Sequence, residues 1–215
     1  MIFEYLFVLK EGIKMKRKIK KQLRLSQIYQ YLENDELYLV QISLDNYDEL
    51  FNGWDATPLK RRDLEPELLD FIEQVGYDIP LKEKVKLSFQ LPNAKFDKQK
   101  EERSKEAIYN NFTMVIHYIN KSLVKNNRKI ISYIAIGLLF LIFAYFLRSS
   151  SMLPVPLSIL SEGLFIGGWV MFWEAFSLFF FVSYDSRARR KRFLRFATSD
   201  IDFDYHDEQN QYPVE

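Results

Sequence analysis

The chain has no cysteine and only two histidines among its 215 residues. The absence of thiols excludes disulfides, zinc–thiolate centres and cysteine nucleophiles. The two imidazoles, His117 and His206, leave little room for histidine-based catalysis or metal binding. The sequence also lacks a glycine-rich phosphate loop, a serine–histidine–aspartate set and internal repeats. These absences favour a protein that is not an enzyme and that has no cofactor.

Long apolar runs are what the sequence has instead. Residues 130–147 are 18 residues without a charge. As a helix they would be about 27 Å long, close to the ~30 Å hydrocarbon core of a bilayer. A second run, 157–183, is interrupted only by Glu162 and Glu174. It would be roughly 40 Å long as one helix, so it must tilt or leave its first turn among the headgroups.

A short segment with Pro154 and Pro156 connects the two runs, and neither proline fits comfortably inside a helix. The pattern therefore predicts an antiparallel two-helix transmembrane hairpin over residues 129–183. The alternative is a buried hairpin of a soluble protein. Eighteen uncharged residues in a row are unusual for a soluble core in a chain of this size.

Basic residues flank the two runs on their outer sides. Four precede the first run within 121–129 and six follow the second within 187–195, whereas the connecting segment has only Arg148. The positive-inside rule then places both termini in the cytoplasm, at the bacterial inner membrane. Nucleic acid is the competing partner for basic clusters, but their position beside the spans favours lipid. The residues expected to contact lipid headgroups are Lys125, Arg128, Lys129, Arg187, Arg189, Arg190, Lys191 and Arg192.

Between a basic N-terminal segment, 1–24, and the first run, residues 25–128 predict a small cytoplasmic α+β domain of two or three strands and two or three helices. Residues 36–44 and 84–91 have the composition or alternation of strands. A helix is expected to begin at Pro66 and to end just before Gly76.

Three further segments leave alternatives open. Residues 26–32 either pair with the following strand or form a short helix, and residues 1–14 are either an upstream extension before Met15 or a short interfacial helix. A helical stretch from Asp97 to about Asn127 is expected to continue into the first span.

The segment 184–215 is basic beside the membrane and acidic at its end. Within it, "DIDFDY" (200–205) alternates aspartates with apolar residues, which predicts a strand that joins the cytoplasmic sheet. A disordered tail is the alternative. Three aspartates two residues apart could also bind calcium. This signal is weak, because no glycine turn and no downstream bidentate glutamate follow at the required spacing.

The stretches "DELFNGWDATPLKRRDLEPELLDFI" and "GGWVMFWEAFSLFFFVSYDSRARRKRF" resemble an uncharacterised family of bacterial two-span membrane proteins with a small cytoplasmic domain. The resemblance rests on the helix start at 63–66, the Gly168–Trp169 pair, and Tyr184–Asp185 followed by arginines. It covers 36–205 loosely and implies no activity. The family often has arginine where this chain has Glu174, so no shared role for that position follows.

Glu174 lies on a predicted stripe of the second run, whose members are Gly163, Gly167, Val170, Glu174 and Ser177. Gly163 and Gly167 form a G-x-x-x-G pair that would allow close helix approach. A matching stripe on the first run contains Tyr133, Gly137, Phe140 and Ala144. An ionised carboxylate inside the membrane costs several kcal/mol. We therefore expect Glu174 to be a neutral acid that donates a hydrogen bond to Tyr133 or to a neighbouring subunit.

Three functions remain open from the sequence. The first is a non-enzymatic membrane protein that anchors a cytoplasmic interaction domain and assembles through its helices as a homo-oligomer or with another membrane protein. The second is a homo-oligomeric pore or membrane-perturbing effector that uses Glu174. The third is an enzyme in the cytoplasmic domain, for which the sequence offers no catalytic set. We expect membrane lipids and no nucleic acid among the partners.

Overall fold

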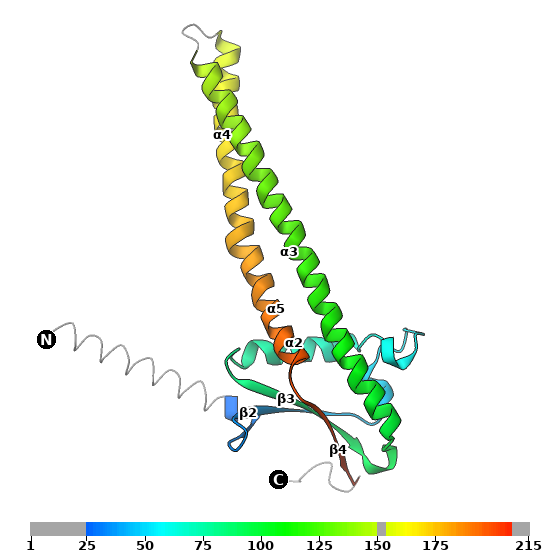
Figure 1. The fold of residues 1–215 in the computed structure, drawn as a ribbon. Coiled ribbons are helices and arrows are strands. Elements are labelled where there is room, and N and C mark those ends of the chain that lie inside the picture. Colours follow the sequence, from blue (N-terminus) through cyan, green and yellow to red (C-terminus); the bar gives the residue numbers. More distant parts are fainter. Residues whose placement is uncertain (1–24, 150–153, 208–215) are drawn as a thin grey trace, which may run out of the picture. The chain divides into compact units, whose positions relative to one another are not determined.

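A computed structural model describes residues 25–149 and 154–207. The fold is mixed α+β, with a four-stranded sheet and two helices that are long and apolar enough to cross a membrane (Figure 1). The predictions for residues 1–24 and for 208–215 lie outside the described residues. So does the middle of the segment that connects the two apolar runs.

The sheet has the order β1-β2-β3-β4. β1 pairs antiparallel with β2, whereas β2 and β3, and β3 and β4, pair in parallel. Both predicted strands are confirmed, and the end of the 26–32 segment, residues 30–32, forms the strand that pairs with β2. Residues 25–128 thus contribute three strands, within the two or three expected, and the tail strand is the fourth. The strands are β1 (Gln30–Leu32), β2 (Leu37–Ser43), β3 (Lys84–Pro92) and β4 (Ile201–His206).

Strand β4 confirms the prediction that "DIDFDY" returns to the sheet. Phe203 lies opposite Phe89 of β3, and the two ring centroids are 5.2 Å apart. Ile201 and Phe203 are buried, whereas Asp204 is exposed, as the alternation requires. The sheet is therefore completed by a strand that the chain reaches only after both long helices.

The helices agree with the predictions in outline. The helix from Asp97 does continue through the first apolar run, as α3. The second helix begins earlier than predicted, at Val155. Pro156 is tolerated there because the N–H groups of a first helical turn have no partner in the helix, so the missing N–H of proline costs nothing. The helical elements are α2 (Pro66–Asp78), α3 (Lys98–Arg148), α4 (Val155–Ser177), the π-helical turn η4 (Leu178–Val182) and α5 (Ser183–Ala197); the 3-10 turns are η1 (Tyr47–Leu50), η2 (Leu59–Arg61) and η3 (Asn93–Lys95).

Gly76 corrects the prediction for the end of α2. The helix begins at Pro66 as expected, but it continues through Gly76 to Asp78. Gly76 is buried, and a Cβ atom there would lie 3.2 Å from the side chains of Arg192 and Phe196. This glycine therefore serves close packing between helices, and it does not end the helix.

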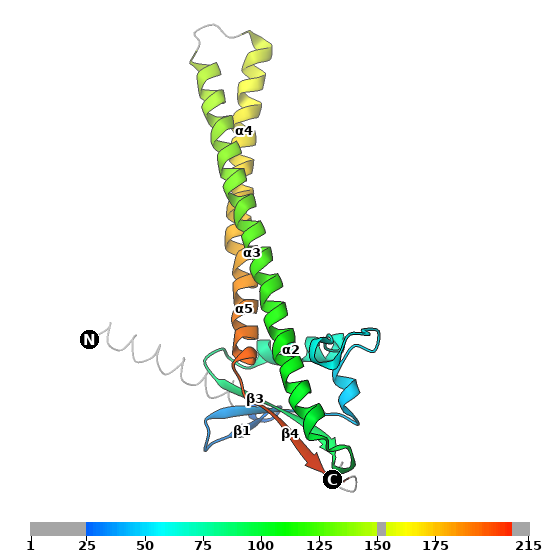
Figure 2. The ribbon, with the colours of Figure 1, turned by 45° about the vertical axis from the view of Figure 1, so that its right-hand side comes forward.

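The chain forms two compact units, and side chains from one face of the sheet contribute to the core of the first. The described residues up to Met114 form this unit together with those from Arg192 onward, and Val115–Lys191 form the second. In both views α2 lies on one side of the strands (Figure 1, Figure 2). The core side chains of the sheet include Val40, Leu87, Phe89 and Ile201, and the helices add Ile72, Val75, Ile108, Phe112, Phe193 and Phe196.

Candidate functional site

The long helices expose most of their apolar side chains. Only 17% of the most apolar stretch of α3, and 11% of that of α4 with α5, is buried within the chain. A core helix of a soluble protein would be mostly buried. The exposed fraction reaches 64% for Leu139 and 68% for Trp173, in the middle of the two apolar runs. This surface is the largest unexplained feature of the described residues.

A row of buried residues, all small except one isoleucine, lies on each of the two apolar helices within the second unit. Buried Ile130, Gly137 and Ala144 of α3, and buried Ser161, Gly168 and Ala175 of α4, each recur at intervals of seven residues. A seven-residue period is typical of helices that pack at the shallow angle of coiled coils. The seam can therefore be followed along both helices.

Two glycines and one hydroxyl define this seam. A Cβ atom on Gly168 would lie 2.8 Å from the side chain of Leu141 and 3.1 Å from the carbonyl oxygen of Gly137. The Ser161 hydroxyl donates to the carbonyl oxygen of Ala144 at 3.2 Å. A larger side chain at Gly168 would thus separate the helices.

The predicted stripe of α4 differs from the face of α4 that packs against α3. Gly163 is exposed, and nothing lies within 4 Å of a Cβ atom built there. Gly167 lies 3.2 Å from the ring of Phe140 by the same measure, and Ser177 is half-buried. The packing glycine is Gly168, one residue onward and roughly 100° around the helix. The seven-residue spacing of small residues, rather than G-x-x-x-G, was the informative signal.

Glu174 also lies outside the contact within the chain. It is exposed, and it makes no hydrogen bond or ion pair among the residues that the structure describes. Gly137 lies opposite Gly168. Counting six residues onward along α4 and six residues back along α3 from this contact places Glu174 at the level of Ile131. The expected bond to the half-buried Tyr133 of the same chain is therefore not made.

A π-helical turn continues the seam beyond Ala175. The next buried small residue is Ser183, eight residues on rather than seven, and η4 lies between the two. A π-turn accommodates one additional residue in a helix. Ser183 is fully buried, and its hydroxyl has no hydrogen-bond partner among the residues that the structure describes. The sequence contained no pattern from which we inferred this turn.

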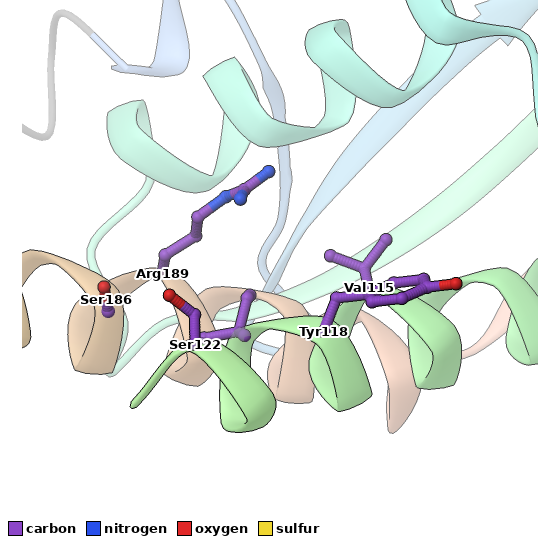
Figure 3. Close-up of a pocket in the computed structure, with 6 residues that line it drawn as sticks. Val115, Tyr118, Ser122, Ser186 and Arg189 are labelled. Atoms are coloured by element: carbon purple, nitrogen blue, oxygen red, sulfur yellow. The ribbon is translucent and has the colours of Figure 1, made fainter. Parts of the chain in front are cut away.

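A pocket of about 310 Å³ lies between α3 and α5 in the second unit (Figure 3). Three hydroxyls and one guanidinium line it beside two aliphatic side chains. The Ser186 hydroxyl donates to the carbonyl oxygen of Val182 at 3.0 Å, and nearby Arg190 Nε donates to Asn120 Oδ1 at 2.7 Å. The lining residues are Val115, Tyr118, Ile119, Ser122, Ser186 and Arg189.

The basic residues expected at the headgroups differ in exposure. Five are exposed, namely Lys125, Arg128, Lys129, Arg187 and Lys191. Arg189 and Arg190 are half-buried at and beside the pocket. Arg192 departs from the prediction, because it is buried in the first unit with its guanidinium 3.7 Å from the ring centre of Tyr77. It lies beside the aromatic residues by which α5 contacts α2 and α3 in this unit, and it is not free for lipid.

A chain of hydrogen bonds joins the tail strand to α3 in the first unit. The hydroxyls of Tyr47 and Tyr205 lie 2.6 Å apart, and Tyr205 donates to Glu101 at 2.7 Å. Lys105 completes the chain, 2.8 Å from Glu101. Burial first, and then the hydrogen bonds with Tyr47 and Glu101, raise the pKa of Tyr205 well above its ordinary value. Such a network fastens β4 in place.

Trp54 is the most exposed large apolar side chain described, with 97% of its surface accessible. Its loop is fixed by Asn52, which accepts from the Trp54 amide at 2.9 Å, and by Asp55. Asp55 accepts from the amides of Asp63 at 2.8 Å and Thr57 at 3.0 Å. These bonds, that from Asp63 foremost, lower the pKa of Asp55. An ordered loop thus presents a bare indole ring.

No protein-family model, curated protein or solved structure matches the chain. The resemblance to two-span bacterial membrane proteins therefore remains an expectation.

Proposed function

We propose that the chain is an integral protein of the bacterial inner membrane, in which the two apolar helices form an antiparallel hairpin. The sheet unit then lies in the cytoplasm and serves as a non-enzymatic interaction module. One observation carries the proposal: the most apolar stretches of both helices are only 17% and 11% buried within the chain. Side chains of this kind gain ~1.5–3 kcal/mol each on leaving water, so lipid is their natural surrounding.

The exposed basic residues support the orientation. Lys125, Arg128 and Lys129 precede the apolar part of α3, and Arg187 and Lys191 follow that of α4. Each contributes about 1 kcal/mol beside anionic headgroups. At the other end of the helices, Arg148 is the only basic residue of the connecting segment.

Extraction of membranes tests the anchoring. We expect the full chain to remain in the membrane pellet after alkaline carbonate treatment, because no ionic contact holds a spanning hairpin. A peripheral protein held by its basic residues would appear in the supernatant. Release of the wild-type chain under these conditions would contradict the proposal.

The Trp54 loop supports the interaction role of the sheet unit. Trp is enriched among the residues that dominate binding energy at interfaces, and pre-ordering of a loop lowers the entropy lost on binding. Here the bonds of Asn52 and Asp55 supply that order. The hydroxyl and carboxyl groups of the tail network are already paired with each other, so they support a structural role for that region.

Assembly through α4 follows from Glu174. The carboxyl is exposed on an otherwise apolar helix surface that includes Trp169, Val170 and Trp173. An acidic group within a membrane almost always faces protein or water. Because the described part of the chain provides no partner, we propose that a second copy does so at this face of α4.

Substitutions of Glu174 test the assembly. Glu174→Gln keeps a hydrogen-bonding side chain, so we expect cross-linked oligomers to persist. Glu174→Leu should reduce them only partly, because polar contacts between helices in membranes contribute well under ~2 kcal/mol. Gly163→Leu tests the same face independently. The surroundings of Gly163 within the chain are open, so a leucine there would meet a second copy and would not clash within the chain.

The pore hypothesis makes the opposite prediction for Glu174→Gln. If Glu174 lined an ion path, this neutral variant would assemble normally and lose conductance. Membrane depolarisation, measured beside cross-linking, separates the two. Normal oligomers with abolished depolarisation would replace the anchoring role with the pore, and unchanged membrane potential in every variant supports anchoring.

A further inference from the structure

We infer that Glu174 forms an ion pair with Lys129 of a second copy, and that two hairpins associate about a two-fold axis along the membrane normal. The inference rests on the proposed hairpin and on the proposed assembly at α4. It goes further by naming the residue that meets Glu174 and the symmetry of the contact. It is carried by the positions of the two charges relative to the packed rows of α3 and α4, which belong to one compact unit.

Glu174 and Lys129 occupy equivalent positions on the two helices. Glu174 is one residue before buried Ala175 of α4, and Lys129 is one residue before buried Ile130 of α3. One residue is roughly 100° around a helix, so neither charge lies in the packed row. Because the helices of a hairpin run in opposite directions, residues that precede the two packed rows by one lie on the same side of it. That side thus carries one acid and one base.

The two charges lie at nearly the same level, but they are not paired within the chain. From the contact of Gly137 with Gly168, Glu174 is six residues onward along α4 and Lys129 is eight residues back along α3. The difference of two residues is about 3 Å along a helix axis, which two long side chains can cover. Both residues are exposed, and neither forms an ion pair with another residue that the structure describes.

A two-fold rotation makes this side of the hairpin complementary to itself. Copies in one bilayer share an orientation, so the axis of a closed dimer is parallel to the membrane normal. When two hairpins meet on this side, the rotation places α4 of each copy against α3 of the other. Glu174 of each copy then meets Lys129 of the other. Contact between the two α4 helices alone would set Glu174 beside its own equivalent, and like charges at an interface are unfavourable.

The remainder of this side is apolar, as a contact inside a membrane requires. The spacing of seven residues leads from Lys129 to Ile136 and Phe143, which are 39% and 55% exposed. On α4 it leads back from Glu174 to Leu160, which is 50% exposed. Lys129 directly precedes the uncharged run 130–147, so the pair would lie at the boundary of the hydrocarbon. Partial exclusion of water at that boundary strengthens an ion pair.

Arg128 provides a matched comparison for Lys129. It is equally basic and also exposed, but it precedes the packed Ile130 by two residues, which is roughly 200° around the helix. Arg128 therefore points away from the proposed contact. Attraction to anionic headgroups depends on both charges equally, whereas the pair depends on Lys129 alone.

Carbodiimide coupling tests the pair, because the reagent joins a carboxyl group to an amine when the two are in contact. Equal amounts of unlabelled and 15N-labelled full chain are reconstituted together in phosphatidylcholine bilayers, and linked peptides are identified by mass spectrometry. We expect a link between Glu174 and Lys129 in which one peptide is labelled and the other is not. A link found only between peptides of the same isotope would place the pair within one chain and would overturn the inference.

Exchange of the two charges tests whether the pair stabilises the dimer. Resonance energy transfer between copies labelled at Glu215→Cys measures the dimer in the bilayer. Glu174→Lys should lower the dimer fraction about tenfold, because two ammonium groups would then meet. Addition of Lys129→Glu should restore it to within about twofold of wild type, whereas addition of Arg128→Glu should not. Equal rescue by the two additions, or no rescue by Lys129→Glu, would contradict the pair.

Failure of this inference is distinguishable from failure of the proposed function. Energy transfer that persists in every variant, without a link between Glu174 and Lys129, would show that the copies assemble through another contact. That result would overturn the pair and leave the membrane anchoring intact. Release of the wild-type chain from the bilayers would instead contradict the anchoring itself.

Discussion

Phe203→Asp is expected to unfold the sheet unit. Phe203 is only 8% exposed, and its ring lies 5.2 Å from that of Phe89 and 5.5 Å from that of Tyr47. Loss of a buried Phe side chain costs ~3–5 kcal/mol, and an uncompensated buried carboxylate adds several more. Because small domains are stable by only ~5–15 kcal/mol, this single change approaches or exceeds the available stability.

Hydrogen exchange measures this effect residue by residue. In the wild type, we expect protection across Ile201–His206, since β4 pairs with the central strand β3. Phe203→Asp should remove that protection and also the protection of β3. Asp200→Asn, at an exposed position before the strand, is the matched control and should leave both unchanged. Fast wild-type exchange across β4 would mean that the tail is not part of the sheet.

Gly168→Leu is expected to separate α3 from α4. A Cβ atom alone would lie 2.8 Å from the side chain of Leu141 and 3.1 Å from a backbone oxygen of Gly137, so a whole isobutyl group cannot be accommodated. Overpacking of a fitted contact costs ~1–3 kcal/mol or more. Gly163→Leu is the control for this contact, since its surroundings within the chain are open.

A cysteine pair measures the separation. The chain has no cysteine, so Ala144→Cys with Ser161→Cys introduces the only thiols, at positions joined by the Ser161 hydroxyl bond. We expect a short bifunctional reagent to cross-link the pair in wild-type and Gly163→Leu backgrounds. The Gly168→Leu background should lose the cross-link. Equal cross-linking in both backgrounds would show that the small residues are not the contact.

Local patterns in the sequence were sufficient for much of the sheet unit. The alternation in 84–91 and in 200–205 predicts β3 and β4, because period two is the direct signature of a strand with one buried face. Pro66 marks the start of α2 correctly. Gly76 misleads, because a glycine near the end of a helix pattern indicates a cap and a packing contact equally well. Only the neighbouring Arg192 and Phe196 distinguish the two.

The helix contact was harder to predict than the helices. The length and apolarity of both runs are visible in the sequence, but every face of such a helix is apolar, so hydrophobicity alone does not mark the packed face and only the spacing of small residues does. G-x-x-x-G at Gly163 and Gly167 suggested one face, and the structure packs the face of Ser161, Gly168 and Ala175. The pocket at Ser122, Ser186 and Arg189 joins residues from distant segments, and their alignment depends on the register that the π-turn sets.

Accessibility of single cysteines to a membrane-impermeant maleimide, in intact and in permeabilised bacterial cells, tests the central claim most directly. Leu139→Cys is the decisive position, because its side chain is 64% exposed in the chain and lies within the first apolar run. The account predicts no labelling there in either condition, labelling of Ser149→Cys in intact cells, and labelling of Thr113→Cys only after permeabilisation. Labelling of Leu139→Cys in the folded, permeabilised sample would show that water, and not lipid, surrounds these helices.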